Sequence, residues 1–181
     1  MITPETISGI ESLLDFCTQN QIYLSVSPQS FNNWPRYELL VSAEYHVLIE
    51  KLIALKKRGA PLLGSMAYFK TLLIQQPYEC FPTLTPRILP DGWLLYPCRP
   101  MEKVEGEQGG RAVNLLEVRT WSEAWTIARQ TYGEAPAACG SCFQQCYLEP
   151  SLMQTKPLQY LWERLRYGPS RAIDLKTYAP G

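Results

Sequence analysis

The sequence predicts an α/β chain that continues into a small metal-binding extension built from a β-hairpin and helices. Three observations predict this fold class. A strand, a long helix and a second strand follow one another in the first half, which is the order of a crossover unit with parallel strands. Prolines become frequent from Pro77 onward, and five of the six cysteines lie beyond the same point, from Cys80 to Cys146. We expect an α/β segment over 1–76, a cysteine-rich region over 77–154, and a C-terminal helix and tail over 155–181.

The first segment opens with a helix that we expect to begin near Thr3 and Pro4. Apolar residues follow at helical spacing: Ile7, Ile10, Leu13, Leu14 and Cys17. Because Cys17 falls on this apolar face, we interpret it as a core thiol and not as a ligand. Residues 22–27 (IYLSVS) read as a strand that Pro28 ends, and residues 29–41 read as a loop.

A helix is predicted from Ser42, its N-cap, to Arg58, with Gly59 ending it. The basic run 56–58 complements the helix dipole, so we interpret it as a solvated helix end and not as a phosphate site. His46, the only histidine, is interpreted as structural. A short apolar strand over 61–65 and a helix over 66–75 complete the segment.

The second half begins with a predicted hairpin over 87–97 around a Pro-Asp-Gly turn. A flexible loop is expected over 102–112. Thr120 and Glu123 form a capping box for a helix that Gly133 ends. The last helix starts at Pro157, and we expect its apolar residues to face inward: Leu158, Leu161, Trp162 and Leu165.

Charge and hydropathy exclude two classes of partner. Seventeen basic and seventeen acidic side chains cancel, so nothing indicates a nucleic-acid partner. No apolar run approaches the ~20 residues of a membrane span. The first residues lack the basic and apolar regions of a signal peptide, so we expect a cytoplasmic protein, in which clustered thiols are ligands more often than disulfides.

The cysteine spacing is the main functional signal. Cys80 and Cys98 bracket the predicted hairpin, whose turn brings them together, and three more cysteines lie close together in a glycine-containing loop: Cys139, Cys142 and Cys146. Five candidates thus compete for four positions. Thiolates suit an iron–sulfur cluster and a zinc ion equally. The spacing alone leaves three alternatives open: a cluster, a zinc site, or buried thiols without a ligand.

These residues also carry a family resemblance. The stretch from Cys80-Phe-Pro through Arg87-Ile-Leu-Pro-Asp-Gly-Trp-Leu-Leu-Tyr-Pro-Cys98, followed by a C-x2-C-x3-C run, resembles the SPASM or twitch extension of radical SAM enzymes. The run that begins at Cys142 (CFQQCYLEPS) also resembles the end of hopanoid-biosynthesis-like radical SAM proteins. Residues 1–76 resemble the last strand–helix units of the partial (β/α) barrel of these enzymes, with 22–27 and 62–65 as barrel strands.

The resemblance implies one auxiliary 4Fe–4S cluster that binds substrate or relays an electron. Cys80 and Cys98 would be ligands, then Cys139 and Cys142, with Cys146 as a rival. The C-x3-C-x2-C motif that holds the catalytic cluster is absent. The chain then corresponds to the C-terminal part of such an enzyme and needs an N-terminal half or subunit to use S-adenosylmethionine on a small-molecule substrate. A structural zinc module that acts as a scaffold is the alternative.

Several other residues have two possible interpretations, one functional and one structural. Gly64-Ser65 ends a strand where parallel sheets bind ligands, or it is simply a turn. Glu149 faces a cluster or substrate, or lies in a surface turn. Tyr147, Trp93 and Tyr96 either shield a cluster from water or serve as ordinary core residues.

Overall fold

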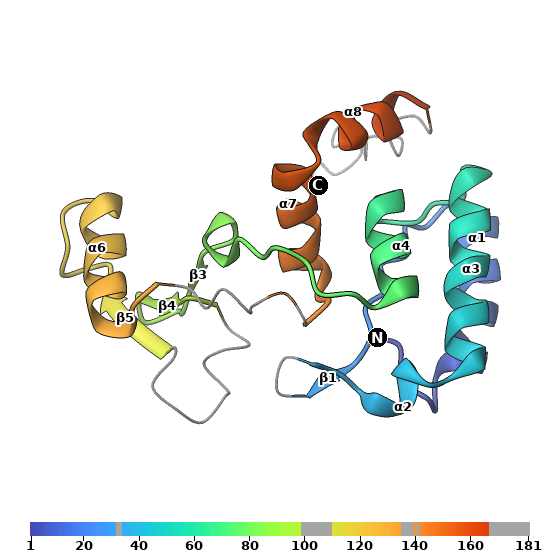
Figure 1. Cartoon of the computed structure of the whole chain (residues 1–181), viewed down its shortest axis with the longest axis horizontal. Helices are drawn as coiled ribbons and strands as arrows, with labels where there is room; N and C mark the ends of the chain where they lie inside the picture. Colours follow the sequence, from blue (N-terminus) through green and yellow to red (C-terminus); the bar gives the residue numbers. More distant parts are fainter. Residues whose placement is uncertain (32–33, 99–109, 135–139, 141, 167–181) are drawn as a thin grey trace, which may run out of the picture.

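The chain folds as a mixture of helices and short strands. The structure, a computed structural model, describes residues 1–31, 34–98, 110–134, 140 and 142–166. Figure 1 shows the helices of the first half at one end and a small sheet with one helix at the other, with α7 between them. In chain order the elements are α1 (Ile7–Gln19), β1 (Ser30–Phe31), β2 (Trp34–Pro35), α2 (Tyr37–Leu40), α3 (Ala43–Lys57), α4 (Met66–Ile74), the 3-10 turn η1 (Pro82–Leu84), β3 (Arg87–Ile88), β4 (Trp93–Tyr96), β5 (Gly110–Asn114), α6 (Trp121–Tyr132), α7 (Gln145–Thr155) and α8 (Pro157–Arg166).

The helices of the first half are close to those predicted. Ser42 caps α3, since its side chain accepts a hydrogen bond from the Tyr45 amide at 3.1 Å. α1 begins at Ile7, after the predicted Thr3 cap, because Thr3–Thr6 form a turn of their own. Cys17 is buried beside the apolar residues of α1, as expected.

The two strands predicted around α3 are reduced to single contacts. Leu24 and Leu62 form an isolated parallel bridge, in which the Leu24 amide donates to the Pro61 carbonyl at 2.9 Å. The parallel direction across the α3 crossover is confirmed, but neither segment extends into a ladder. The loop expected over 29–41 is wrong in part, because β1, β2 and α2 lie within it.

The predicted hairpin is confirmed. β3 and β4 pair antiparallel, and Gly92 turns between them at φ 85°, a backbone angle that favours glycine. β5 adds to the other side of β4, so the loop expected over 102–112 is wrong at 110–112. Residues 102–109 lie outside the described residues. Thr120 caps α6 by accepting from the Glu123 amide at 3.1 Å, as predicted.

α7 joins the two halves of the chain. Phe143, Leu148 and Leu152 pack into the same core as α1, α3 and α4. The domain boundaries near 76 and 154 stay a prediction, although the apolar core runs across the first of them.

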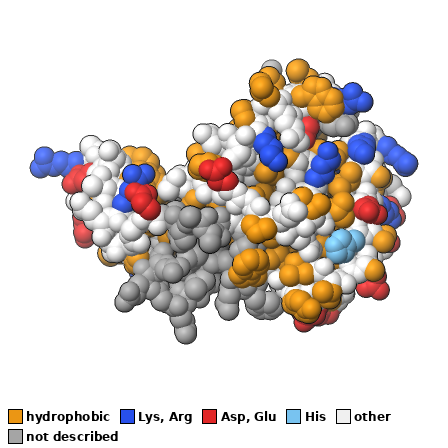
Figure 2. Space-filling model, in the orientation of Figure 1, with side chains coloured by type: hydrophobic (Ala, Val, Ile, Leu, Met, Phe, Trp, Pro, Cys, Tyr) orange, Lys and Arg blue, Asp and Glu red, His pale blue; other side chains and the backbone are white. Residues whose placement is uncertain are grey.

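The expected inward face of α8 is wrong. Leu158 and Leu165 are 80% and 77% exposed, and Leu161 and Trp162 are more than half exposed. The residue that α8 buries is Glu163. Figure 2 shows orange, hydrophobic side chains gathered at the top of the molecule, where Figure 1 places α8.

Candidate functional site

Four of the five candidate cysteines come together. Cys80 precedes η1, Cys98 follows β4, Cys142 precedes α7, and Cys146 lies in the first turn of α7. They form one packed cluster around the buried ring of Tyr147. None of the four is joined to another by a disulfide. We call these four residues with Tyr147 the cysteine cluster.

Side-chain hydrogen bonds hold the Cys80 segment against α7. The Phe81 amide donates to Ser151 Oγ at 2.9 Å, and that hydroxyl donates to the Tyr147 carbonyl at 2.7 Å. Thr85 Oγ1 donates to the carbonyl oxygen of Cys146 at 2.9 Å. Because these bonds lie beside Cys80 in one segment and Cys146 in α7, they hold the two backbone segments next to each other.

Close backbone contact positions the loop that carries Cys142. The Tyr78 amide donates to the Gly140 carbonyl at 3.1 Å. A Cβ atom on Gly140 would lie 1.7 Å from the Tyr78 carbonyl oxygen, so only glycine fits here. Ser30 Oγ donates to the Cys142 carbonyl at 2.9 Å and ties the same loop to β1.

The cysteine cluster is partly buried and lies beside a cation. Cys98 and Cys142 are 5% and 6% exposed. Tyr78 Oη lies 3.6 Å from Cys142 Sγ, and burial, followed by the nearby Cys142 and Cys80, raises the pKa of this phenol. Hydrogen bonds with Tyr147 and Cys146 raise the pKa of the Arg87 guanidinium, whose carbon lies 5.9 Å from the centre of the Tyr147 ring.

The structure describes four of the five candidate cysteine ligands. Cys139 lies outside the described residues. Within the described ranges, no three His, Cys, Asp or Glu side chains form a group that could hold a single metal ion. His46 Nδ1 lies 2.7 Å from the Ser42 carbonyl oxygen one turn earlier in α3, so its contact is local to that helix. The donor chemistry of the cluster is therefore that of thiols alone, which suits soft metals.

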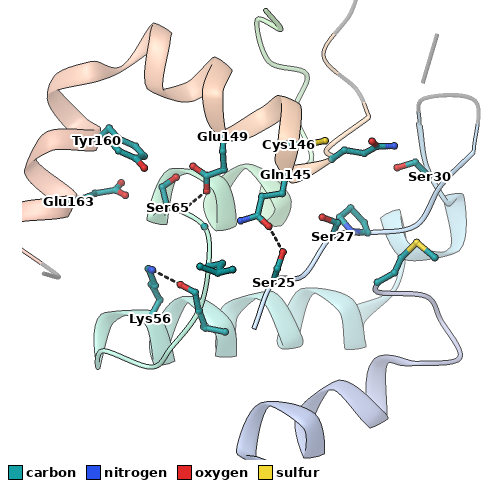
Figure 3. A pocket seen from close by; sticks show the side chains of 16 residues that line it. Ser25, Ser27, Ser30, Lys56, Ser65, Gln145, Cys146, Glu149, Tyr160 and Glu163 are labelled. Atoms are coloured by element: carbon teal, nitrogen blue, oxygen red, sulfur yellow. Dashed lines mark hydrogen bonds between the residues drawn. The ribbon is translucent and has the colours of Figure 1, made fainter. Parts of the chain in front are cut away.

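A pocket of about 940 Å³ adjoins the cysteine cluster. Cys146 belongs to both. The pocket lies among the segment after the Leu24 bridge, the end of α3, the loop before α4, and the helices α7 and α8 (Figure 3). Its walls combine apolar residues, among them Met1, Pro28, Leu62 and Leu63, with serine, glutamine and charged side chains.

Two carboxylates meet the N-terminus of α4 inside this pocket. The Ser65 amide donates to Glu149 Oε1, and the Met66 amide donates to Glu163 Oε2 at 2.8 Å. Burial raises the pKa of Glu149 despite its hydrogen bonds with Ser65. Lys56 Nζ donates to the Leu62 carbonyl at 2.6 Å, and burial lowers its pKa.

These positions correct two sequence predictions. Lys56 is not a solvated helix end, because it is half-buried and lines the pocket; Lys57 and Arg58 remain exposed. Glu149 does not lie in a surface turn, because it belongs to α7 and faces the pocket. Gly64 and Ser65 line the pocket as well.

The role of Glu163 in the pocket was not predicted from the sequence. The sequence analysis placed the apolar residues of α8 inward and gave Glu163 no role, and no local signal marks Glu163 as a partner of the Met66 amide. Glu149 carried a better signal: it lies three residues after Cys146, and residues at that spacing share one side of a helix.

Among the described residues no helix is long and apolar enough to cross a membrane. Comparison with protein-family models, curated proteins and solved structures finds no match to this chain.

Proposed function

We propose that the cysteine cluster holds one auxiliary 4Fe–4S cluster and that the chain is the C-terminal part of a radical SAM-type enzyme. In this proposal, 1–76 supply the last strand–helix units of a partial barrel and the hairpin with α7 supplies the metal-binding extension. The observation that carries the proposal is the convergence of Cys80, Cys98, Cys142 and Cys146 from separate segments.

This convergence supports ligand function because the four cysteines are up to 66 positions apart in the chain, from 80 to 146. Cysteines that serve only as small apolar residues are not expected to cluster with one another. Cys17 is an example of such a packing residue, since it is buried among the apolar residues of α1. Thiolates are the ligands that iron–sulfur clusters prefer. Cys139 competes with these four for the ligand positions.

The surroundings support a tuned cluster. Tyr147 and the low exposure of Cys98 and Cys142 keep water from part of the cluster, and Tyr78 Oη lies within hydrogen-bond distance of Cys142 Sγ. Burial and hydrogen bonds to the sulfur atoms both shift a cluster's reduction potential. Arg87 beside Cys146 places a positive charge next to the cysteine cluster, where it would offset part of the negative charge of metal-bound thiolates. When bound, the cluster would bind substrate directly or relay an electron.

The test is metal and sulfide analysis with a visible spectrum, on protein purified without oxygen. We expect about four irons and four sulfides per chain and a brown absorbance that bleaches on reduction. Cys98→Ala should lose the chromophore. Cys17→Ala is the matched control, since it removes a buried cysteine from a different part of the core, and it should keep the chromophore.

Three results would reject the proposal. Zinc at about one ion per chain with no visible absorbance would identify a structural zinc module instead. Protein without metal, whose stability does not change on chelation, would leave the cysteines as packing residues. Full iron content in the Cys98→Ala variant would remove the hairpin from the ligand set.

A further inference from the structure

We propose that the 940 Å³ pocket binds a small molecule through an ammonium group, which Glu149 and Glu163 hold at the N-terminal end of α4. This inference does not rest on the metal site, because the residues that carry it are not ligands of the proposed cluster. It names a ligand class for the pocket that Cys146 borders.

The pocket has the size and the wall of a ligand site. Small-molecule pockets span about 300–1,000 Å³ and combine apolar walls with a few convergent polar groups. Here the polar groups come from five separate segments of the chain and point into one space (Figure 3). The pocket also lies directly beyond the parallel Leu24–Leu62 contact, because Ser25, Leu63 and Gly64 line it.

An anionic ligand is disfavoured at this end of the pocket. A helix N-terminus normally attracts phosphate or carboxylate groups through its free amides. The amides of Ser65 and Met66 already donate to Glu149 and Glu163. A phosphate would therefore have to displace two carboxylates of the protein and then remain beside them.

The two carboxylates keep capacity for a cation. Glu149 accepts from the Ser65 amide, and Glu163 accepts from the Met66 amide and from Gln159 Nε2, so each carboxylate can accept further hydrogen bonds. In the part of the chain that the structure describes, no salt bridge includes Lys56, Glu149 or Glu163, although the Lys56 charge interacts with both carboxylates at longer range. Lys56 instead turns its ammonium toward the Leu62 carbonyl.

Burial of the Glu149 charge carries a cost that the α4 amides do not offset, as the direction of its pKa shows. An ammonium group placed between the two carboxylates would offset it. On the opposite wall, Ser25 Oγ donates to Gln145 Oε1 and Ser30 Oγ donates to the Cys142 carbonyl, so these hydroxyls would meet a hydroxyl group of the same ligand as hydrogen-bond acceptors.

Gly64 makes this arrangement possible. Its φ of 109° is a backbone angle that favours glycine, and a Cβ atom there would lie 3.2 Å from both Glu149 Oε1 and Gln145 Nε2. The loop before α4 can thus approach α7 closely enough for the Ser65 amide to reach Glu149. The glycine shapes the acidic end of the pocket.

The experiment compares three probes that share one carbon skeleton: pentylamine, pentanol and pentanoate. Ligand-observed saturation-transfer NMR on the full chain measures their binding. We expect pentylamine to bind most tightly, and Glu149→Gln or Glu163→Gln to weaken it about tenfold, the effect of losing one charged hydrogen bond. Both glutamines can still accept from the α4 amides, so thermal unfolding should show folded proteins.

Three controls locate the binding. Glu50→Gln alters an exposed glutamate of α3 outside the pocket and should leave pentylamine binding unchanged. Leu63→Trp fills the pocket and should abolish it. Cys98→Ala should not alter it, whatever that variant does to a metal, so failure of this inference and failure of the metal proposal are distinguishable.

The inference is overturned if pentanoate binds as well as pentylamine or better. It is also overturned if no probe binds at millimolar concentration, or if pentylamine binding is the same in Glu149→Gln, Glu163→Gln and Glu50→Gln.

Discussion

Ser151→Ala tests how the tertiary structure brings Cys80 to Cys146. The Ser151 side chain is fully buried in α7, where it accepts from the Phe81 amide and donates to the Tyr147 carbonyl. Alanine keeps the helix and the packing but removes the acceptor. The Phe81 amide then has no acceptor in the position it occupies.

The size of the effect follows from this lost acceptor. A buried N–H group without a partner costs about 1–3 kcal/mol. The Phe81–Ser151 bond is only part-buried, so we expect the lower half, about 1–2 kcal/mol of unfolding free energy. Urea denaturation of the full chain measures it, and hydrogen exchange should speed up at the Phe81 amide because the Cys80 segment opens more often.

Thr155→Ala is the matched control. Its hydroxyl donates to the Ser151 carbonyl within the same helix at 3.0 Å and links no two elements. We expect a change within about 0.5 kcal/mol. If Ser151→Ala costs no more than Thr155→Ala, or if exchange at Phe81 is unchanged, the hydrogen bond does not hold the Cys80 segment on α7.

Further predictions concern charge, core and surface. Burial raises the pKa of Glu149 above its ordinary 4.5, so its contribution to stability is full below that pH and is lost as the pH rises through the folded-state pKa. Thermal unfolding should therefore show Glu149→Gln gaining stability relative to the unmodified chain between acid and neutral pH; a constant difference would contradict the cost assigned to this charge. Leu148→Ala should cost about 2–5 kcal/mol in urea denaturation, because Leu148 is fully buried where α7 joins the first-half core; a loss below 1 kcal/mol would mean that the site is not tightly packed. Leu158→Ser should change the unfolding free energy by less than about 0.5 kcal/mol, since this side chain is 80% exposed on α8, and a large loss would restore the inward face predicted from its periodicity.

Local chemistry in the sequence was enough for the helix ends and the hairpin. Ser42 and Thr120 accept hydrogen bonds from amides three residues ahead, so each cap depends only on its own neighbours. Gly92 permits the hairpin turn in the same local way. The sequence also predicted that Cys80 and Cys98, which flank this hairpin, lie close together, and both residues belong to the cysteine cluster.

Contacts between segments far apart in the chain could not be predicted from the sequence. The start of β5 was expected to be a loop because a glycine-containing polar stretch leads into it, and pairing with the edge of β4 makes it a strand. The segment 22–27, predicted as a strand, forms an isolated bridge to Leu62 and no ladder. Strand formation depends on a partner, and the partner is set by the fold.

The sequence by itself determined which residues share a helix face, where helices begin, and that thiols suited to a soft metal gather in one part of the chain. The tertiary structure decided which face meets the core. In α8 that face carries Glu163, because the nearest available partners are the amides at the start of α4, and a buried amide needs an acceptor more than an apolar neighbour. Periodicity describes one helix, whereas burial depends on what the rest of the chain places against it.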